Sequence, residues 1–168
     1  MVTTFSVLVE NKFWVLTRIA RLFARHMFNI DALTVAPTLD KDISCMTIDV
    51  IEDEVGVRRL EMELKKIINV LSVHLCKKED YLVTEMALIK ISKDNQEFKA
   101  FVKEMKLFQA RVLYSHDDIE VFEFSGKRSR VNQFIDVGLA HNAQSVVRTG
   151  SLAMPKAINV ITDAKQGA

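Results

Sequence analysis

The chain has 168 residues, with 23 Lys and Arg against 22 Asp and Glu and a formal net charge of +1. This near balance argues against nucleic acid as the main partner, because phosphate binding needs a basic surface. Apolar residues make up 49% of the chain, as in a globular protein, and no apolar run approaches the roughly 20 residues that span a bilayer.

The cellular compartment follows from the N-terminus and the cysteines. The N-terminus lacks the charged and apolar regions of a signal peptide. Cys45 and Cys76 form neither a CxxC pair nor a four-ligand zinc site. We therefore expect a cytoplasmic protein with reduced thiols, no membrane association and no metal of its own.

The first half of the chain alternates between strand and helix patterns. Apolar residues recur every second position in the strands and every third or fourth position in the helices. The order strand, helix, strand, strand, helix, strand is that of the ferredoxin-like βαββαβ unit. The predicted elements are strands at 3–9, 30–36, 43–51 and 71–75, and helices over 13–27 and from Asp53.

The first predicted helix has an apolar face that should pack on the sheet, and Asn29 suits a left-handed C-terminal cap. Arginines on the opposite side form either a solvated face or a surface for a partner. The apolar face comprises Leu16, Ile19, Ala20, Phe23 and Met27, and the arginines are Arg18, Arg21 and Arg25.

The same order of elements recurs after the charged segment 77–80, which we interpret as a domain linker. The sequence therefore predicts an α+β protein with two tandem ferredoxin-like domains, 1–76 and 81–154, and a loosely ordered tail over 155–168. The elements expected in the second domain are strands at 82–92, 110–115, 119–124 and 143–148, and helices over 98–108 and 127–139.

No arrangement typical of a catalytic site is present. The four histidines are scattered, and the glycine motifs of nucleotide sites and nucleophile elbows are absent. RNA-recognition modules share the βαββαβ order, but the predicted strand 43–51 carries no aromatic residue for base stacking. We therefore expect neither catalysis by this chain alone nor RNA binding.

Residues 10–18 form the predicted turn from the first strand into the first helix. The start of a helix exposes unpaired N–H groups and the positive end of the helix dipole, which suit a carboxylate or phosphate. The turn can therefore bind a small anionic ligand, or it can be only a connection, because most helix starts bind nothing but water.

Several short segments together point to one family: Ser6–Asn11, Leu16–Arg18, Asn29–Ile30, Leu33–Thr38, Met46–Ile48 and Arg148–Gly150. In these segments the chain resembles the small, regulatory subunit of acetolactate synthase (acetohydroxyacid synthase), over about residues 3–154. The match is more specific in the first half than in the second.

This resemblance implies that the first domain is an ACT domain, a module that often binds amino acids and pairs with a second copy into a homodimer. It also implies that the chain binds and activates a catalytic large subunit in valine and isoleucine (branched-chain amino acid) biosynthesis, with allosteric inhibition by valine. Thiamine diphosphate, magnesium and FAD would belong to that partner, and this chain would hold no cofactor.

The resemblance further implies a valine site at the start of the first helix. The family pattern has glycine where this chain has Trp14, and glycine lets a ligand approach the backbone closely. We hypothesise that the indole blocks the pocket and weakens or abolishes valine feedback; alternatively, it folds outward and leaves the pocket open. The expected effector residues are Asn11, Trp14, Val15, Leu16, Ile30 and Ala36, with Asn29 from a neighbouring subunit, and the candidate partner contacts are Arg18, Arg21 and Arg25.

A function of a different class also fits the sequence. The chain could be a free-standing ACT-domain amino-acid sensor that regulates another enzyme or a transcription factor. Co-purification with a large thiamine-dependent protein would distinguish this alternative from a regulatory subunit.

Overall fold

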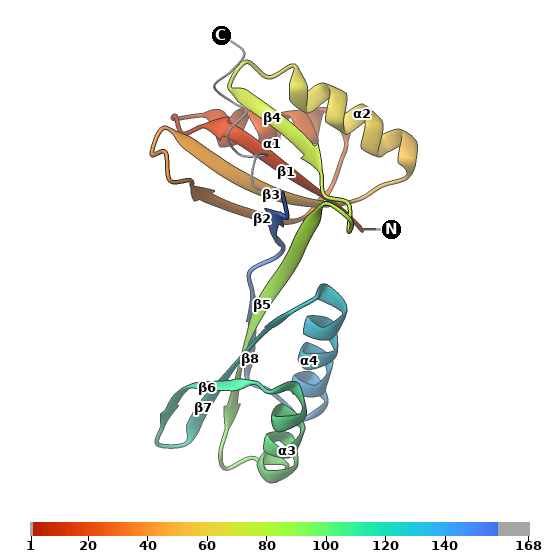
Figure 1. Cartoon of the computed structure of the whole chain (residues 1–168). Coiled ribbons are helices and arrows are strands. Elements are labelled where there is room, and N and C mark those ends of the chain that lie inside the picture. The colour runs from red at the N-terminus through yellow and green to blue at the C-terminus, as the bar shows by residue number, and fades with distance from the viewer. Residues whose placement is uncertain (1, 158–168) are drawn as a thin grey trace. The chain divides into compact units, whose positions relative to one another are not determined.

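A computed structural model describes residues 2–157, and these divide into two compact units (Figure 1). Of the described residues, 2–83 and 151–157 form unit 1, and 84–150 form unit 2. Each unit contains an antiparallel sheet and two helices in the βαββαβ order, which confirms the predicted α+β class. The predicted tail over 155–168 lies almost wholly outside the described residues.

Unit 1 is built around its central strand. Its elements are β1 (Val2–Glu10), α1 (Val15–His26), β2 (Ile30–Pro37), β3 (Ile43–Ile51), α2 (Glu54–Lys65) and β4 (Val70–Leu75). The sheet order is β2-β3-β1-β4, and β1 pairs with β3 from Val2↔Ile51 to Glu10↔Ile43. Alternate residues of β1, among them Phe5 and Val7, are fully buried under α1 and α2. Each such side chain contributes about 1.5–3 kcal/mol of hydrophobic stabilisation.

The buried face of α1 differs from the predicted one. Val15, Ile19 and Phe23 are buried, whereas Leu16 is 46% exposed and Met27 is 90% exposed. Ala20 is exposed as well. The predicted apolar face was therefore wrong in part: Ile19 and Phe23 are buried as expected, but the centre of the buried face is rotated by roughly 60° toward Val15.

The C-terminus of α1 also differs from the prediction. Met27, with φ 57°, is the left-handed cap, and its N–H donates to the Ala24 carbonyl at 3.2 Å. The N–H of Phe28 donates to the Phe23 carbonyl at 2.9 Å, which completes the pattern of a Schellman cap. Asn29 therefore does not cap the helix, because the chain already leaves it two residues earlier.

Unit 2 repeats the architecture around β5. Its elements are β5 (Tyr81–Ser92, of which the first residues belong to unit 1), α3 (Phe98–Phe108), β6 (Arg111–His116), β7 (Ile119–Gly126), α4 (Arg128–Ala140) and β8 (Ser145–Arg148). The sheet order is β6-β7-β5-β8. Ile89 of β5, Phe101 of α3 and Phe134 of α4 are fully buried in one core, and Phe101 meets Phe122 edge to face at 5.3 Å.

Unit 2 begins at residue 84 and ends at residue 150, which differs from the predicted domain ranges 1–76 and 81–154. The predicted domain limits stay a prediction. The predicted linker 77–80 forms a turn, in which the N–H of Tyr81 donates to the Lys77 carbonyl at 2.9 Å. After unit 2 the chain forms β9 (Leu152–Pro155), which pairs with β5 and was not foreseen.

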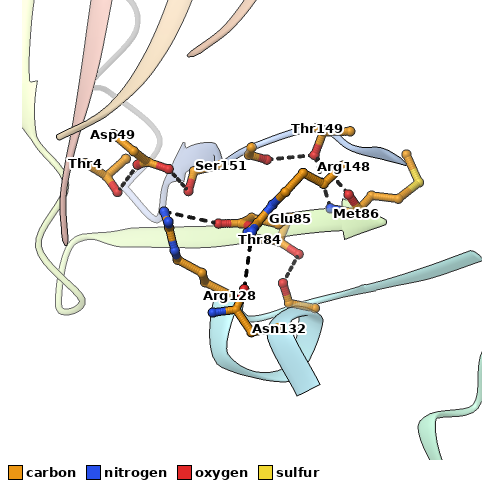
Figure 2. Close-up of polar contacts among 12 residues, drawn as sticks. Thr4, Asp49, Thr84, Glu85, Met86, Arg128, Asn132, Arg148, Thr149 and Ser151 are labelled. Carbon is orange, nitrogen blue, oxygen red and sulfur yellow. Dashed lines mark hydrogen bonds and ion pairs between the residues drawn. The ribbon is translucent and has the colours of Figure 1, made fainter. Parts of the chain in front are cut away.

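A buried carboxylate in unit 1 joins distant parts of the chain. Asp49 of β3 is fully buried, and it accepts hydrogen bonds of 2.6 Å from the hydroxyls of Thr4 and Ser151 (Figure 2). Burying a carboxylate is costly unless donors surround it. The Ser151 hydroxyl therefore fixes the returning segment to the sheet of unit 1.

Cys45 and Cys76 are both free. Burial, with smaller contributions from the neighbouring Cys45 and Asp49, raises the pKa of the Cys76 thiol to about 12. Because the thiolate is the reactive form, Cys76 is an inert side chain at neutral pH.

A second buried carboxylate closes the sheet of unit 2. Glu85 of β5 is fully buried and forms ion pairs with Arg148 and, at 3.7 Å, with Arg128 (Figure 2). The N–H of Thr149 donates to the Met86 carbonyl at 3.0 Å. Gly150 has φ 78°, in the left-handed region that favours glycine. The segment Arg148–Gly150 therefore has a structural role in unit 2, because it joins β8 to β5.

We expect Arg148→Ala to destabilise the protein more than Glu85→Gln. Loss of Arg148 removes the nearest cation from a fully buried carboxylate, which should cost about 2–4 kcal/mol. Loss of the Glu85 charge leaves Arg148 and Arg128, whose side chains are 37% and 28% exposed and can be hydrated, so we expect about 1–2 kcal/mol.

Urea unfolding followed by circular dichroism measures both losses. Arg111→Ala is the matched control. It breaks an ion pair with Glu123 at 2.7 Å, but the Arg111 side chain is 69% exposed, so this substitution should cost less than about 1 kcal/mol. Equal losses for the two arginine variants would contradict a structural role of the Glu85 cluster.

Candidate functional site

The β1–α1 turn, residues 11–14, is tied to the neighbouring β2–β3 turn. The N–H of Asn11 donates to the Asp42 carbonyl at 2.7 Å, and its side-chain amide donates to the Lys41 carbonyl at 2.8 Å. Asn11 is exposed, yet its backbone and side chain both bind the same neighbouring turn. The backbone N–H and the side-chain amide of the predicted effector residue Asn11 therefore both already donate within the chain.

A polar network anchors the other side of the turn. The amide of Asn69, just before β4, donates to the Glu10 carboxylate, and Arg18 donates to the Asn69 side-chain oxygen at 2.7 Å. Lys12 forms an ion pair with Glu10 at 3.2 Å. The Asn69 hydrogen bond, followed by that of Lys12, holds the pKa of Glu10 below its ordinary value. The turn is thus fixed from both sides before any ligand binds.

Trp14 stands at the N-terminal boundary of α1 in an unusual conformation. Its φ of 65° lies in the left-handed region, and its side chain is 75% exposed. Phe13 beside it is 85% exposed, with the two ring centroids 6.1 Å apart. Neither a capping side chain nor an acidic residue occupies the first turn of α1. The positive end of this helix is therefore not neutralised by its own first turn.

The other expected effector residues lie in two groups within one chain. Ala36 lies near the end of β2 that adjoins the Asn11 turn, whereas Asn29 and Ile30 lie at its beginning. Six steps of extended strand separate Ile30 from Ala36, roughly 20 Å, so the two groups cannot contact one small ligand in a single chain. Val15 is 3% exposed and belongs to the core, so its side chain is not open to a ligand in this chain.

The three arginines proposed as partner contacts are not equivalent. Arg18 is held by Asn69, whereas Arg21 and Arg25 are exposed on the outer face of α1. The roles of the expected effector and partner residues stay predictions.

Sequence reasoning missed two residues near the turn. Asn69 has no motif, and a polar residue between Ile68 and Val70 was the only signal for it. Leu39, in the polar β2–β3 turn, is fully exposed and so adds an apolar side chain to a turn that Asn11 contacts. Among residues 2–157, no group of three or more His, Cys, Asp or Glu side chains could hold a metal, and no helix is long and apolar enough to span a membrane.

Comparison with known proteins identifies the family. Residues 5–72 match the model of the AHAS small subunit-like ACT domain, and residues 84–157 match that of the small subunit of acetolactate synthase. The acetolactate synthase small subunit of Mycobacterium bovis is 32% identical over 162 residues, which cover 96% of each chain. The chain belongs to the acetolactate synthase small-subunit family.

Further members of the acetolactate synthase small-subunit family support this assignment. The small subunit of Mycobacterium avium is 35% identical over 134 residues, 80% of each chain. The crystal structure of the Thermotoga maritima small subunit has a TM-score of 0.81 and 29% identity, and the match covers 94% of this chain and 98% of that chain. The resemblance inferred from the sequence is therefore confirmed, as is the ACT domain in the first half.

Removal of the Asn69 amide should raise the pKa of Glu10 toward its ordinary value. The hydrogen bond from Asn69 is the largest cause of the lowered pKa, and Asn69→Ala removes it while Lys12 remains. Because the folded-state pKa is lowered, the carboxylate adds stability above its ordinary pKa that is lost as the pH falls through the lowered value.

Carboxyl NMR titration of the wild type and of Asn69→Ala measures the shift. Glu63, whose pKa is lowered chiefly by its hydrogen bond from Lys66, is the internal control and should not change. An unchanged Glu10 titration in the variant would show that Asn69 does not hold the turn.

Proposed function

We propose that the chain binds and activates a catalytic large subunit of acetolactate synthase in branched-chain amino acid biosynthesis. The single observation that carries the proposal is that both units match small-subunit family models in order along the chain. The name small subunit implies a larger partner, and thiamine diphosphate, magnesium and FAD would be held there. The free thiols fit a cytoplasmic setting.

The proposed regulatory site is the β1–α1 turn at a homodimer of ACT domains. The helix start carries no acidic residue in its first turn, so the carboxylate of a branched-chain amino acid would meet a favourable field there. Asn11 and Ala36 of one copy would combine with Asn29 and Ile30 of a second copy, because a single chain separates them. Two copies are thus needed to complete the site.

Trp14 sets the sensitivity of this proposed site. Its backbone adopts a conformation that glycine adopts without strain, and its exposed indole stands directly beside the helix start. In a dimer the indole would fill the space that a valine side chain needs. Valine feedback is then weak or lost, while activation of the catalytic subunit is retained.

Addition of the purified chain to the catalytic subunit of the same organism should raise the rate of pyruvate condensation severalfold. The two proteins should also co-elute in size-exclusion chromatography. The chain alone, assayed with pyruvate and the cofactors, is the control and should show no turnover. Absence of both co-elution and activation would favour a free-standing amino-acid sensor instead.

Trp14→Gly should gain valine binding, because it removes the indole and suits the left-handed backbone. In isothermal titration we expect no binding by the wild type at about 1 mM valine. The affinity of the variant for valine should be at least about tenfold higher, a change within the usual range of coupling free energies between sites. Phe13→Ala is the matched control, because it removes the adjacent exposed ring without changing position 14. Clear binding of valine by the wild type would contradict the proposed block.

A further inference from the structure

Strand β6 forms an exposed edge of the sheet in unit 2. Among the described residues it pairs only with β7, so its outer edge has no strand partner there. All six of its residues are exposed. Three large apolar side chains follow one another in it: Val112 is 48% exposed, Leu113 50% and Tyr114 54%.

Strands β2 and β8 carry features that discourage strand pairing, whereas the edge strands β4 and β6 contain neither proline nor lysine; of these two, β6 exposes more large apolar side chains. Proteins commonly protect edges with proline, lysine, bulges or very short strands. Strand β2 ends at Pro37, and β8 has only four residues. The register of β6 shifts between Val112 and Tyr114, but the strand contains neither proline nor lysine. The bulge leaves its apolar side chains exposed.

The charges at the two ends of β6 are complementary to each other. Arg111 begins the strand, and Asp117 and Asp118 follow its end. The Arg111 side chain is 69% exposed beside Glu123, and the Asp117 side chain is 80% exposed beside His116. If two copies of β6 lie antiparallel, Arg111 of each copy faces Asp117 of the other, and Tyr114 lies at the two-fold axis. Opposite charges placed in this way favour pairing.

We propose that β6 is a self-association edge, at which two copies of this chain pair antiparallel and join their sheets. The pairing is two-fold symmetric, so this edge by itself joins two copies. It is separate from the ACT-domain pairing proposed above, because it involves only unit 2. A single strand pair is smaller than the interface of about 1,200–2,000 Å² in stable complexes, so the association is weak.

Disulfide trapping of the full-length chain tests this edge directly. Under mild oxidation with glutathione disulfide, Tyr114→Cys should give a covalent dimer, because directly opposed residues bring their Cβ atoms within disulfide reach. Leu107→Cys, at a position 79% exposed in α3, is the matched control for random collision. The wild type shows the background from Cys45 and Cys76.

A charge placed on the edge should weaken the trapping. Adding Leu113→Lys to the Tyr114→Cys variant should lower the yield of covalent dimer at least about fivefold, because the two lysines are then diagonal neighbours across the axis and repel each other. A dimer yield no higher than that of Leu107→Cys would overturn the proposal. The assay uses this chain alone, so its outcome is independent of whether the chain activates a catalytic subunit.

Discussion

The packing of Val15, Ile19 and Phe23 determines much of the surface of unit 1. These residues recur every fourth position, so they fix the rotation of α1 on the sheet. Leu16 lies roughly 60° from the centre of this buried face, at its edge, and its side chain is 46% exposed. The same rotation leaves Trp14, just before the first helical residue, outside the core. The conformation of the turn expected to bind a ligand thus depends on core packing.

The two buried carboxylates have structural partners and differ in the way they are satisfied. Asp49 accepts from the hydroxyls of Thr4 and Ser151, whereas Glu85 is paired with arginines. A buried charge costs several kcal/mol unless donors or counter-charges surround it. Each carboxylate therefore favours one specific closure of the chain, at Ser151 in unit 1 and at Arg148 in unit 2.

The order and type of the elements could be predicted from sequence, and the orientation of α1 could not. Period-two alternation located β3 at Ile43–Ile51 to the residue, because Met46, Ile48 and Val50 alternate regularly with polar residues. The apolar pattern of α1 allowed two faces, and only packing on the sheet selects Val15 over Leu16. Met27 becomes the cap through backbone hydrogen bonds, against the usual preference for glycine or asparagine.

The candidate site could be located from sequence only in part. Segments shared with the family pointed to the turn, and Trp14 there has a φ of 65°, in the region that suits glycine; its role in a ligand site stays a prediction. The anchor Asn69 could not be found, since it lies 59 residues from its partner Glu10 and carries no motif. The left-handed conformation of Trp14 costs about 1–2 kcal/mol relative to a right-handed one, and an indole that is 75% exposed recovers little of this by burial within the chain. That imbalance favours an interpretation in which the indole gains its contacts outside the single chain, at the surface where a second copy or a ligand would meet the turn.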